Sequence, residues 1–293
     1  MFIEAFVTYL RVERGCSLHT LKAYETDLRL YAEYLAGVDE TLSLSDSDAD
    51  LVRCWVSELI DKGCAVSSVC RKLSSLRTFF AYMKVSGRML SNPVDGVRAP
   101  KKRKALPSFI KEEEVEELCD IAFAGEDFLS VRNRMIISTF YELGLRLSEL
   151  CGLDVADVDF VENQVKVCGK RNKQRVVPFG IGLKNAFCEY LKVRSEVALD
   201  GEAAFFVSSR GSRISSSQVY NMVRGQLARV TSIKRKSPHT LRHTFATVML
   251  NNDAELGVVK ELLGHERLAT TEVYTHVTFE ELKRVYKKAH PRA

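Results

Sequence analysis

The chain has 293 residues, of which 46% are hydrophobic and 28% are charged, so it is long enough for two ordinary globular domains with real cores. Its net charge of +5 is mild and does not by itself identify a nucleic-acid-binding protein. The eight cysteines show no C-x-x-C pairing or metal-ligand spacing, and no apolar stretch is long enough to span a membrane, so we expect a cytoplasmic protein without a metal site.

The first ninety residues predict a small bundle of amphipathic helices. Apolar side chains recur at helical spacing in residues 2–10, and Ser17 is a good N-cap for a second helix. A third apolar stripe runs through residues 51–60, and Ser67 or Ser68 is predicted to open a fourth helix. Four such helices joined by short loops make a helical domain.

A change of composition divides the chain. Asn92 and Pro93 interrupt the helical pattern, and a basic run bracketed by prolines follows. We therefore expect a helical domain over residues 1–91, a linker over 92–107 and a second domain over 108–293.

The second domain is predicted to be mixed, so the fold class is mainly α with a small β-hairpin or sheet. β-branched residues gather in two short runs around a polar tip, which is typical of a hairpin. Helices are predicted over residues 111–120, 131–143, 183–193 and 215–230, and strands over 164–167, 176–179 and 205–207.

The stretch from Ser237 onward predicts a helix that carries chemistry. Ser237 suits an N-cap and Pro238 suits the first helical position. His239 lies opposite the apolar stripe and Arg242 at its border, one turn apart, so both can reach one ligand. The stripe consists of Leu241, Phe245, Val248 and Met249.

A second helix and a phenol follow. Gly264 is predicted to end that helix, and His265 comes directly after this cap. Thr270 or Thr271 can then cap a short helix carrying Tyr274. The inward residues of the second helix are Val258, Val259, Leu262 and Leu263.

These residue types suit the attack of a tyrosine hydroxyl on a phosphodiester. Such an attack adds charge to the non-bridging oxygens, which arginine and imidazolium groups can neutralise without a metal. A phenol also needs a nearby base before it becomes a good nucleophile. Each residue alone is more often a core or surface residue, so the ordered combination carries the hypothesis.

The order H-x-x-R-H, L-G-H and Y-T-H resembles the tyrosine recombinase family, also called phage integrase-like. The resemblance extends to G-L-R-L-S-E-L-C-G-L from Gly144, to C-G-K-R-N-K-Q-R from Cys168 and to the terminal A-H-P-R-A, so it covers essentially the whole chain. It is similar to the Xer subgroup, and the runs that begin at Asn92 and Val285 are more like XerC than XerD members.

The resemblance implies a catalytic C-terminal domain and a helical core-binding domain that forms one jaw of a clamp on DNA. It implies that DNA is cleaved and rejoined through a 3′-phosphotyrosyl intermediate, with Tyr274 as nucleophile and Arg146 and Arg242 on the non-bridging oxygens. No ATP, divalent metal or other cofactor is expected.

The remaining catalytic roles also follow from the resemblance. His265 would donate to the phosphate, His239 would act as the general base or as a phosphate donor, and Lys170 would protonate the departing 5′ oxygen. His243 matches the motif without an assigned role, and we expect it to be structural. Arg171 replaces the glycine usual after this lysine, which can shift the turn that aims Lys170.

Clusters of basic residues predict where the DNA backbone would lie. One cluster is in the linker, a second runs through the predicted hairpin from Lys166 to Arg175, and a third is Lys234, Arg235 and Lys236. The predicted DNA-contact residues are Arg71, Lys72, Arg77, Lys101, Lys102, Arg103, Lys173 and Arg175.

The resemblance also implies partners and a role. The chain would act on a duplex recombination site as a homo- or hetero-tetramer with a related Xer recombinase, resolve chromosome dimers at cell division, and respond to a DNA translocase of the division apparatus. The apolar stripe of residues 279–286 either folds onto its own domain or docks into a neighbouring subunit.

Other functions remain open at this stage. The alternatives are an XerD-like or other phage-type integrase, a type IB topoisomerase that uses the same residues, and a DNA-binding protein without catalysis.

Overall fold

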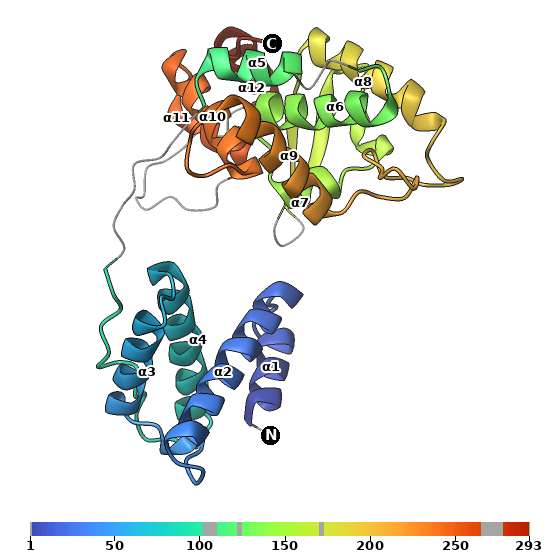
Figure 1. Cartoon of the computed structure of the whole chain (residues 1–293). Helices are drawn as coiled ribbons and strands as arrows, with labels where there is room; N and C mark the ends of the chain where they lie inside the picture. Colours follow the sequence, from blue (N-terminus) through green and yellow to red (C-terminus); the bar gives the residue numbers. More distant parts are fainter. Residues whose placement is uncertain (1, 102–109, 122–124, 170–172, 265–277, 293) are drawn as a thin grey trace. The chain divides into compact units, whose positions relative to one another are not determined.

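The computed structural model describes residues 2–101, 110–121, 125–169, 173–264 and 278–292 (Figure 1). The chain divides into two compact units, Met1–Ala105 and Leu106–Ala293. Each unit has a hydrophobic core of its own.

The described part of the first unit is a bundle of four α-helices, as predicted. They are α1 (Phe2–Val12), α2 (Leu18–Val38), α3 (Ala49–Asp61) and α4 (Val66–Val85), with a short 3₁₀ turn at Leu44–Asp46. The side chain of Ser17 accepts a hydrogen bond from the backbone N–H of Thr20 and caps α2. Aromatic rings fill the core, and Phe6 meets Phe79 edge to face at a centroid distance of 5.3 Å.

The start of α4 differs from the prediction. The N-cap residue is Ala65, whose carbonyl accepts hydrogen bonds from the N–H groups of Ser68 and Val69, and no side chain caps the helix. The predicted cap at Ser67 or Ser68 is therefore wrong. The helix begins at Val66, before both serines, because the first helical hydrogen bonds already go to the carbonyl of Ala65 and Val69 is buried in the core.

The predicted linker over 92–107 begins inside the first unit. Val94 and Val97 are buried in the core of that unit. The Asn92 side chain donates to the carbonyl of Arg77 and accepts from the N–H of Val94. Residues 92–97 are therefore packed structure rather than a spacer.

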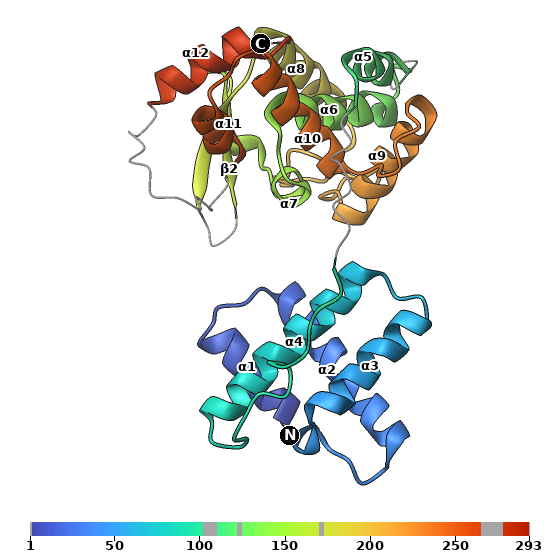
Figure 2. The ribbon, with the colours of Figure 1, turned by 90° about the vertical axis from the view of Figure 1, so that its left-hand side faces the viewer.

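The second unit is built around α6, as Figures 1 and 2 show. This helix packs against α8 and α10, and α10 in turn contacts α11 and α12. No helix in the described ranges has the length and apolarity needed to cross a membrane. The described helices of this unit are α5 (Glu112–Ile121), α6 (Phe128–Leu143), α7 (Leu147–Cys151), α8 (Ile181–Ser195), α9 (Ser216–Val230), α10 (Pro238–Asn251), α11 (Leu256–Leu263) and α12 (Phe279–Ala289).

A small antiparallel sheet completes the described part of the second unit. Its strands are β1 (Val158–Asp159), β2 (Gln164–Cys168) and β3 (Gln174–Pro178), in the order β1-β2-β3. The register places Val167 opposite Arg175, so the predicted hairpin is confirmed. The strand predicted at 205–207 is wrong, because Val207 makes only an isolated bridge, with Arg213.

The C-terminal helix α12 folds onto its own unit in the single chain. Leu282, Tyr286 and Ala289 are buried in the core, and α12 contacts α10, α11 and β3. Docking of this helix into a neighbouring subunit stays a prediction.

A buried carboxyl group on α6 leads to a testable prediction. Glu142 is 4% exposed and its Oε2 atom has no hydrogen-bond partner within the described ranges. Burial raises the pKa of Glu142 to about 8, although the charge of Arg292 lowers it in part. Because the folded-state pKa is raised, the stability linked to this group is present below its usual value of 4.5 and is lost as the pH rises towards 8.

We therefore expect Glu142→Gln to raise the free energy of unfolding of this unit at alkaline pH by on the order of a few kcal/mol, and by much less near pH 5. Thermal unfolding of both proteins across pH measures this difference. Burial lowers the pKa of His290 to about 4, so this histidine changes the free energy of unfolding only at acid pH. An equal effect of the substitution at every pH would contradict the prediction.

Candidate active site

Helix α10 turns Arg242 into the protein and two histidines outward. Arg242 Nη1 donates to the carbonyl of Gly144 at 2.5 Å, and Nη2 donates to the carbonyl of Leu263 at 2.5 Å. The Arg242 side chain is 8% exposed, so it lies deeper than the border position that was predicted. His239 and His243 are both exposed, so no packing role follows for His243.

Arg146 is aimed by the joint between α6 and α7. Gly144 ends α6 in the left-handed conformation at φ 58°, and a Cβ there would meet the Phe245 ring at 2.6 Å. The tight turn makes Arg146 the N-cap residue of α7. Its Nη1 donates to Glu149 Oε1 at 2.6 Å and its Nη2 to the carbonyl of Gly264 at 2.7 Å.

Glu149, which the sequence analysis did not single out, lies at the centre of the site. Its Oε1 accepts from Arg146 and Arg175, and its Oε2 accepts from the Arg146 backbone N–H and from Arg175. Arg242 Nη1 is 3.8 Å from Oε2. The available signal was its position three residues after an N-cap, where an acidic side chain bonds back to the cap N–H.

The same contacts decide the ionisation of Glu149. Burial alone raises the pKa of this carboxyl group, but hydrogen bonds from Arg175 and Arg146 and the charge of Arg175 outweigh burial and lower the pKa to about 2. Glu149 is therefore ionised throughout the physiological range, and it can fix several guanidinium groups at once.

The C-terminal end of α11 binds the three arginines that face Glu149. A helix end leaves carbonyl groups unpaired and carries partial negative charge, so it favours cations. The carbonyls of three consecutive residues each accept from a different arginine: Leu262 from Arg175, Leu263 from Arg242 and Gly264 from Arg146. We call Arg146, Arg175 and Arg242 the arginine cluster.

The arginine cluster has an excess of positive charge. Against its three cations stands one carboxylate, Glu149, so the group as described carries net positive charge suited to a phosphate. Burial, followed by repulsion from Arg146, lowers the pKa of Arg242 to about 10, so this side chain still carries its charge at neutral pH. Arg146 is the more accessible of the two predicted phosphate ligands, with 33% of its side chain exposed.

Three of the predicted DNA contacts, Arg71, Lys72 and Arg175, pair with buried carboxylates. Lys72 is buried, with its Nζ 3.3 Å from Asp27 Oδ1. Asp27 is fully enclosed and also accepts from Ser75 at 2.7 Å and from Arg71. Lys72 is therefore held inward by a buried carboxylate that needs a cation as its partner, and its contact with DNA stays a prediction. Arg71 bonds to Asp27 but keeps about half of its side chain exposed.

Arg175, another predicted DNA contact, also pairs with a buried carboxylate, and its contact with DNA stays a prediction. Its side chain is 11% exposed, and its described hydrogen bonds go to Glu149 and Leu262 rather than outward. Arg77, Lys101 and Lys173 are exposed, so their prediction as DNA contacts stands as a prediction. Several other predicted residues lie outside the described residues, namely Lys102, Arg103, Lys170, His265 and Tyr274.

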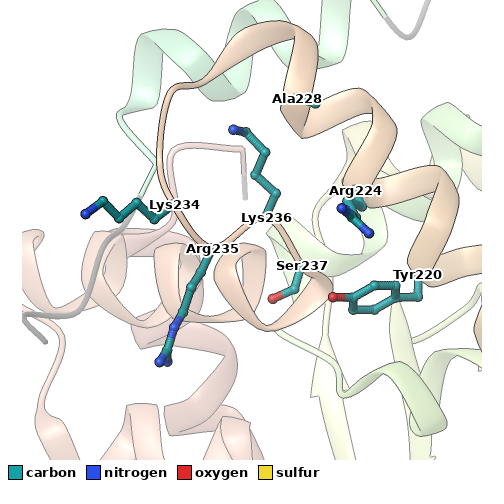
Figure 3. Close-up of a pocket in the computed structure, with 7 residues that line it drawn as sticks. All are labelled: Tyr220, Arg224, Ala228, Lys234, Arg235, Lys236 and Ser237. Carbon is teal, nitrogen blue, oxygen red and sulfur yellow. The ribbon is translucent and has the colours of Figure 1, made fainter. Parts of the chain in front are cut away.

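A basic pocket adjoins the start of α10 (Figure 3). It has a volume of about 550 Å³ and lies between α9 and the loop that leads to Ser237, so the third basic cluster of the sequence lines it. In Figure 3 the hydroxyl end of Tyr220 points towards Ser237. The lining residues are Tyr220, Arg224, Ala228, Lys234, Arg235, Lys236 and Ser237.

Two family descriptions match the chain. Residues 108–281 match the phage integrase family, and residues 3–87 match the N-terminal SAM-like domain of phage integrases. A protein of Vibrio atlanticus (strain LGP32) named tyrosine recombinase XerC is 40% identical over 294 aligned residues, which cover 99% of this chain and 93% of the relative. A tyrosine recombinase XerC of Chlorobaculum parvum (strain DSM 263 / NCIMB 8327) is 38% identical and covers 100% of this chain and 95% of the relative.

Solved structures share the fold. The integrase of transposon Tn1549, in complex with transposon right-end DNA, superposes with a TM-score of 0.77 at 19% identity and covers 98% of each chain. The XerH site-specific recombinase, in a post-cleavage complex with a palindromic difH substrate, superposes with a TM-score of 0.73 at 19% identity, over 94% of this chain and 77% of the other. At these identities the similarity concerns the mainly helical fold with its small antiparallel sheet.

Proposed function

Because the chain belongs to the phage integrase family of site-specific tyrosine recombinases, we propose that Tyr274 is its nucleophile and that Arg146 and Arg242 bind the scissile phosphate. The observation that carries this proposal is the arrangement of both guanidinium groups around Glu149 and the end of α11. A site with two fixed cations stabilises the extra charge that develops on the phosphoryl oxygens.

The proposed cleavage transfers the phosphoryl group from the 5′ oxygen to the oxygen of Tyr274. The Tyr274 hydroxyl loses its proton to a base, for which His239 is the candidate, and its oxygen bonds to phosphorus. The bond from phosphorus to the 5′ oxygen breaks, and Lys170 gives that oxygen a proton. His265 donates a hydrogen bond to the phosphate. The phosphotyrosyl ester keeps the energy of the broken bond, so the 5′-hydroxyl of another strand can reverse the step and rejoin the DNA.

A nicked duplex tests this function directly. After cleavage next to the nick, the short 5′-hydroxyl fragment diffuses away and the protein stays covalently bound to the 3′ phosphate. We expect a protein–DNA band resistant to denaturant on duplexes carrying candidate chromosomal sites. The band should form without ATP and in the presence of EDTA, and its loss on adding EDTA would contradict the proposed chemistry.

We propose that the cellular role resembles that of the XerC relatives, namely resolution of chromosome dimers in the cytoplasm. The active assembly would be a tetramer on two duplexes, either of this chain alone or with a related Xer recombinase, under control of a division-associated DNA translocase. Analytical centrifugation with two site-bearing duplexes tests the assembly. A type IB topoisomerase would relax supercoiled DNA without bringing two duplexes together.

The basic pocket is proposed to bind the duplex backbone. Lys234, Arg235 and Lys236 are on one loop directly before α10, which carries Arg242. Changing all three to glutamine should weaken binding to any duplex and make the plot of log affinity against log salt shallower, by roughly 0.9 for each phosphate that the variant no longer neutralises. Changing exposed Lys192 on α8 to glutamine is the control for charge alone. An unchanged salt slope in the triple variant would contradict the proposal.

A further inference from the structure

Arg175 has no role in the chemistry above, yet its guanidinium group is held at the centre of the site. Its Nη1 lies 2.8 Å from Glu149 Oε1 and its Nη2 lies 2.9 Å from Glu149 Oε2, so the guanidinium group grips both carboxylate oxygens. Its Nε donates to the carbonyl of Leu262 at 2.7 Å. A planar fork with donors in fixed directions can make these bonds together, and an ammonium group cannot.

The stem of Arg175 also packs against the turn that ends α11. Gly264 is in the left-handed conformation at φ 62°, and a Cβ there would come within 3.2 Å of Arg175 Cδ and Nη1. Glycine at this position therefore serves the turn and also lets the arginine approach. In the sequence, the next residue is His265.

Arg175 is anchored on a rigid element. It is in β3, paired with Val167 of β2, and Val167 is buried in the core. One side chain thus links the hairpin to α7 through Glu149 and to α11 through Leu262 and Gly264. In sequence, the tip of this hairpin contains Lys170.

We propose that Arg175 is a positioning residue, which fixes Glu149 and the end of α11 so that Arg146 and Arg242 are aligned on the phosphate. This inference rests on the proposed function. Arg175 and Arg146 both donate to Glu149 Oε1. If Arg175 is removed, the Glu149 carboxylate can move, and Arg146 moves with it because the two stay hydrogen-bonded. Arg175 donates to the carbonyl of Leu262, and Arg242 donates to the carbonyl of the next residue, Leu263.

Arg175→Gln tests the role when binding and cleavage are measured separately. At saturating protein, the single-turnover rate of covalent-complex formation should fall by about 10²-fold, because small misplacements of positioning groups cost this much. Duplex affinity and its salt slope should stay unchanged. Arg175→Lys should recover little of the rate. A shallower salt slope with a full cleavage rate would instead make Arg175 a DNA contact and overturn the proposal.

Two comparisons separate positioning from a general loss of structure. Arg194→Gln also removes a half-buried arginine that donates to main-chain carbonyls, those of Glu202 and Ala204, so it is a matched control for stability. It should keep the cleavage rate at temperatures where it is folded. If Arg175→Gln does not fold, Arg175→Lys is assayed in its place, and a wild-type rate in that variant overturns the proposal.

A double-mutant cycle with Glu149→Gln completes the test. If Arg175 acts through Glu149, its substitution in the Glu149→Gln background should cost much less than 10²-fold, whereas additive losses would overturn the proposal. The charged groups that face Glu149 are Arg146, Arg175 and Arg242. Because Arg175 lowers the pKa of Glu149, its loss should raise that pKa and move the acid limb of the pH profile of the cleavage rate to higher pH. Absence of any covalent band with the wild-type protein would instead be a failure of the proposed function itself.

Discussion

Replacing Tyr274 with phenylalanine is expected to abolish the covalent protein–DNA band while duplex binding is retained. The substitution removes the one oxygen that would bond to phosphorus, and it leaves the ring and the whole cationic site in place. The measurement is a denaturing gel of the nicked-duplex reaction, with duplex binding followed in parallel by fluorescence anisotropy. The loss should be complete to background, since a rejoining enzyme without its nucleophile has no alternative route to the phosphotyrosyl ester.

Tyr34→Phe, on α2 of the first unit, is the matched control and should leave the band unchanged. Proteolysis of the wild-type adduct should recover the DNA on the peptide that contains Tyr274. Covalent capture by the Tyr274→Phe protein, or an adduct on another tyrosine, would contradict the assignment. A DNA-binding protein without catalysis would form no band in any variant.

Replacing Arg242 with glutamine is expected to have the second largest effect, with a loss of cleavage rate on the order of 10²–10³-fold. In the proposed mechanism the guanidinium group supplies positive charge at the phosphate, and the carbonyls of Gly144 and Leu263 hold it in place. Arg242→Lys should restore only a small part of the rate, because an ammonium group cannot reach both carbonyls and the phosphate at once. Single-turnover cleavage at saturating protein measures the loss.

The neighbouring His243→Ala variant is the control for Arg242, since His243 is exposed on the same helix and has no assigned role. Thermal unfolding must accompany the assay, because the two carbonyls left without partners cost about 1–3 kcal/mol each. A rate near that of the wild type in a folded Arg242→Gln protein would exclude this arginine from the chemistry.

Local patterns were enough to predict the helices of the first unit and the hairpin of the second. Apolar spacing, the Ser17 cap and the Gly264 terminus act within one or two turns, so neighbouring residues decide them. The predicted cap at Ser67 or Ser68 was wrong because adjacent serines are equally suitable N-caps in the sequence, and the packing of α4 in the core determines where the helix begins. The strand at 205–207 was wrong because a strand needs a partner along its length, and β-branched or aromatic residues do not specify one.

The site was predicted in part, for a similar reason. The motif order identified Arg146 and Arg242 as residues of one site, and the structure brings both to Glu149. It did not identify Glu149 itself, and it did not show that Lys72 and Arg175 pair with carboxylates of their own protein. A basic side chain looks the same in a sequence whether it faces a phosphate or a carboxylate of its own protein.

The sequence by itself determined the family, the two-part organisation and the types of group available for the chemistry, because residue type, spacing and helical periodicity are properties of the local chain. Only the tertiary structure decided which groups each cation contacts. Lys72 pairs with Asp27 in the interior, and Arg175 binds Glu149 and the end of α11, because a buried carboxylate or a helix end needs positive charge that distant parts of the chain supply.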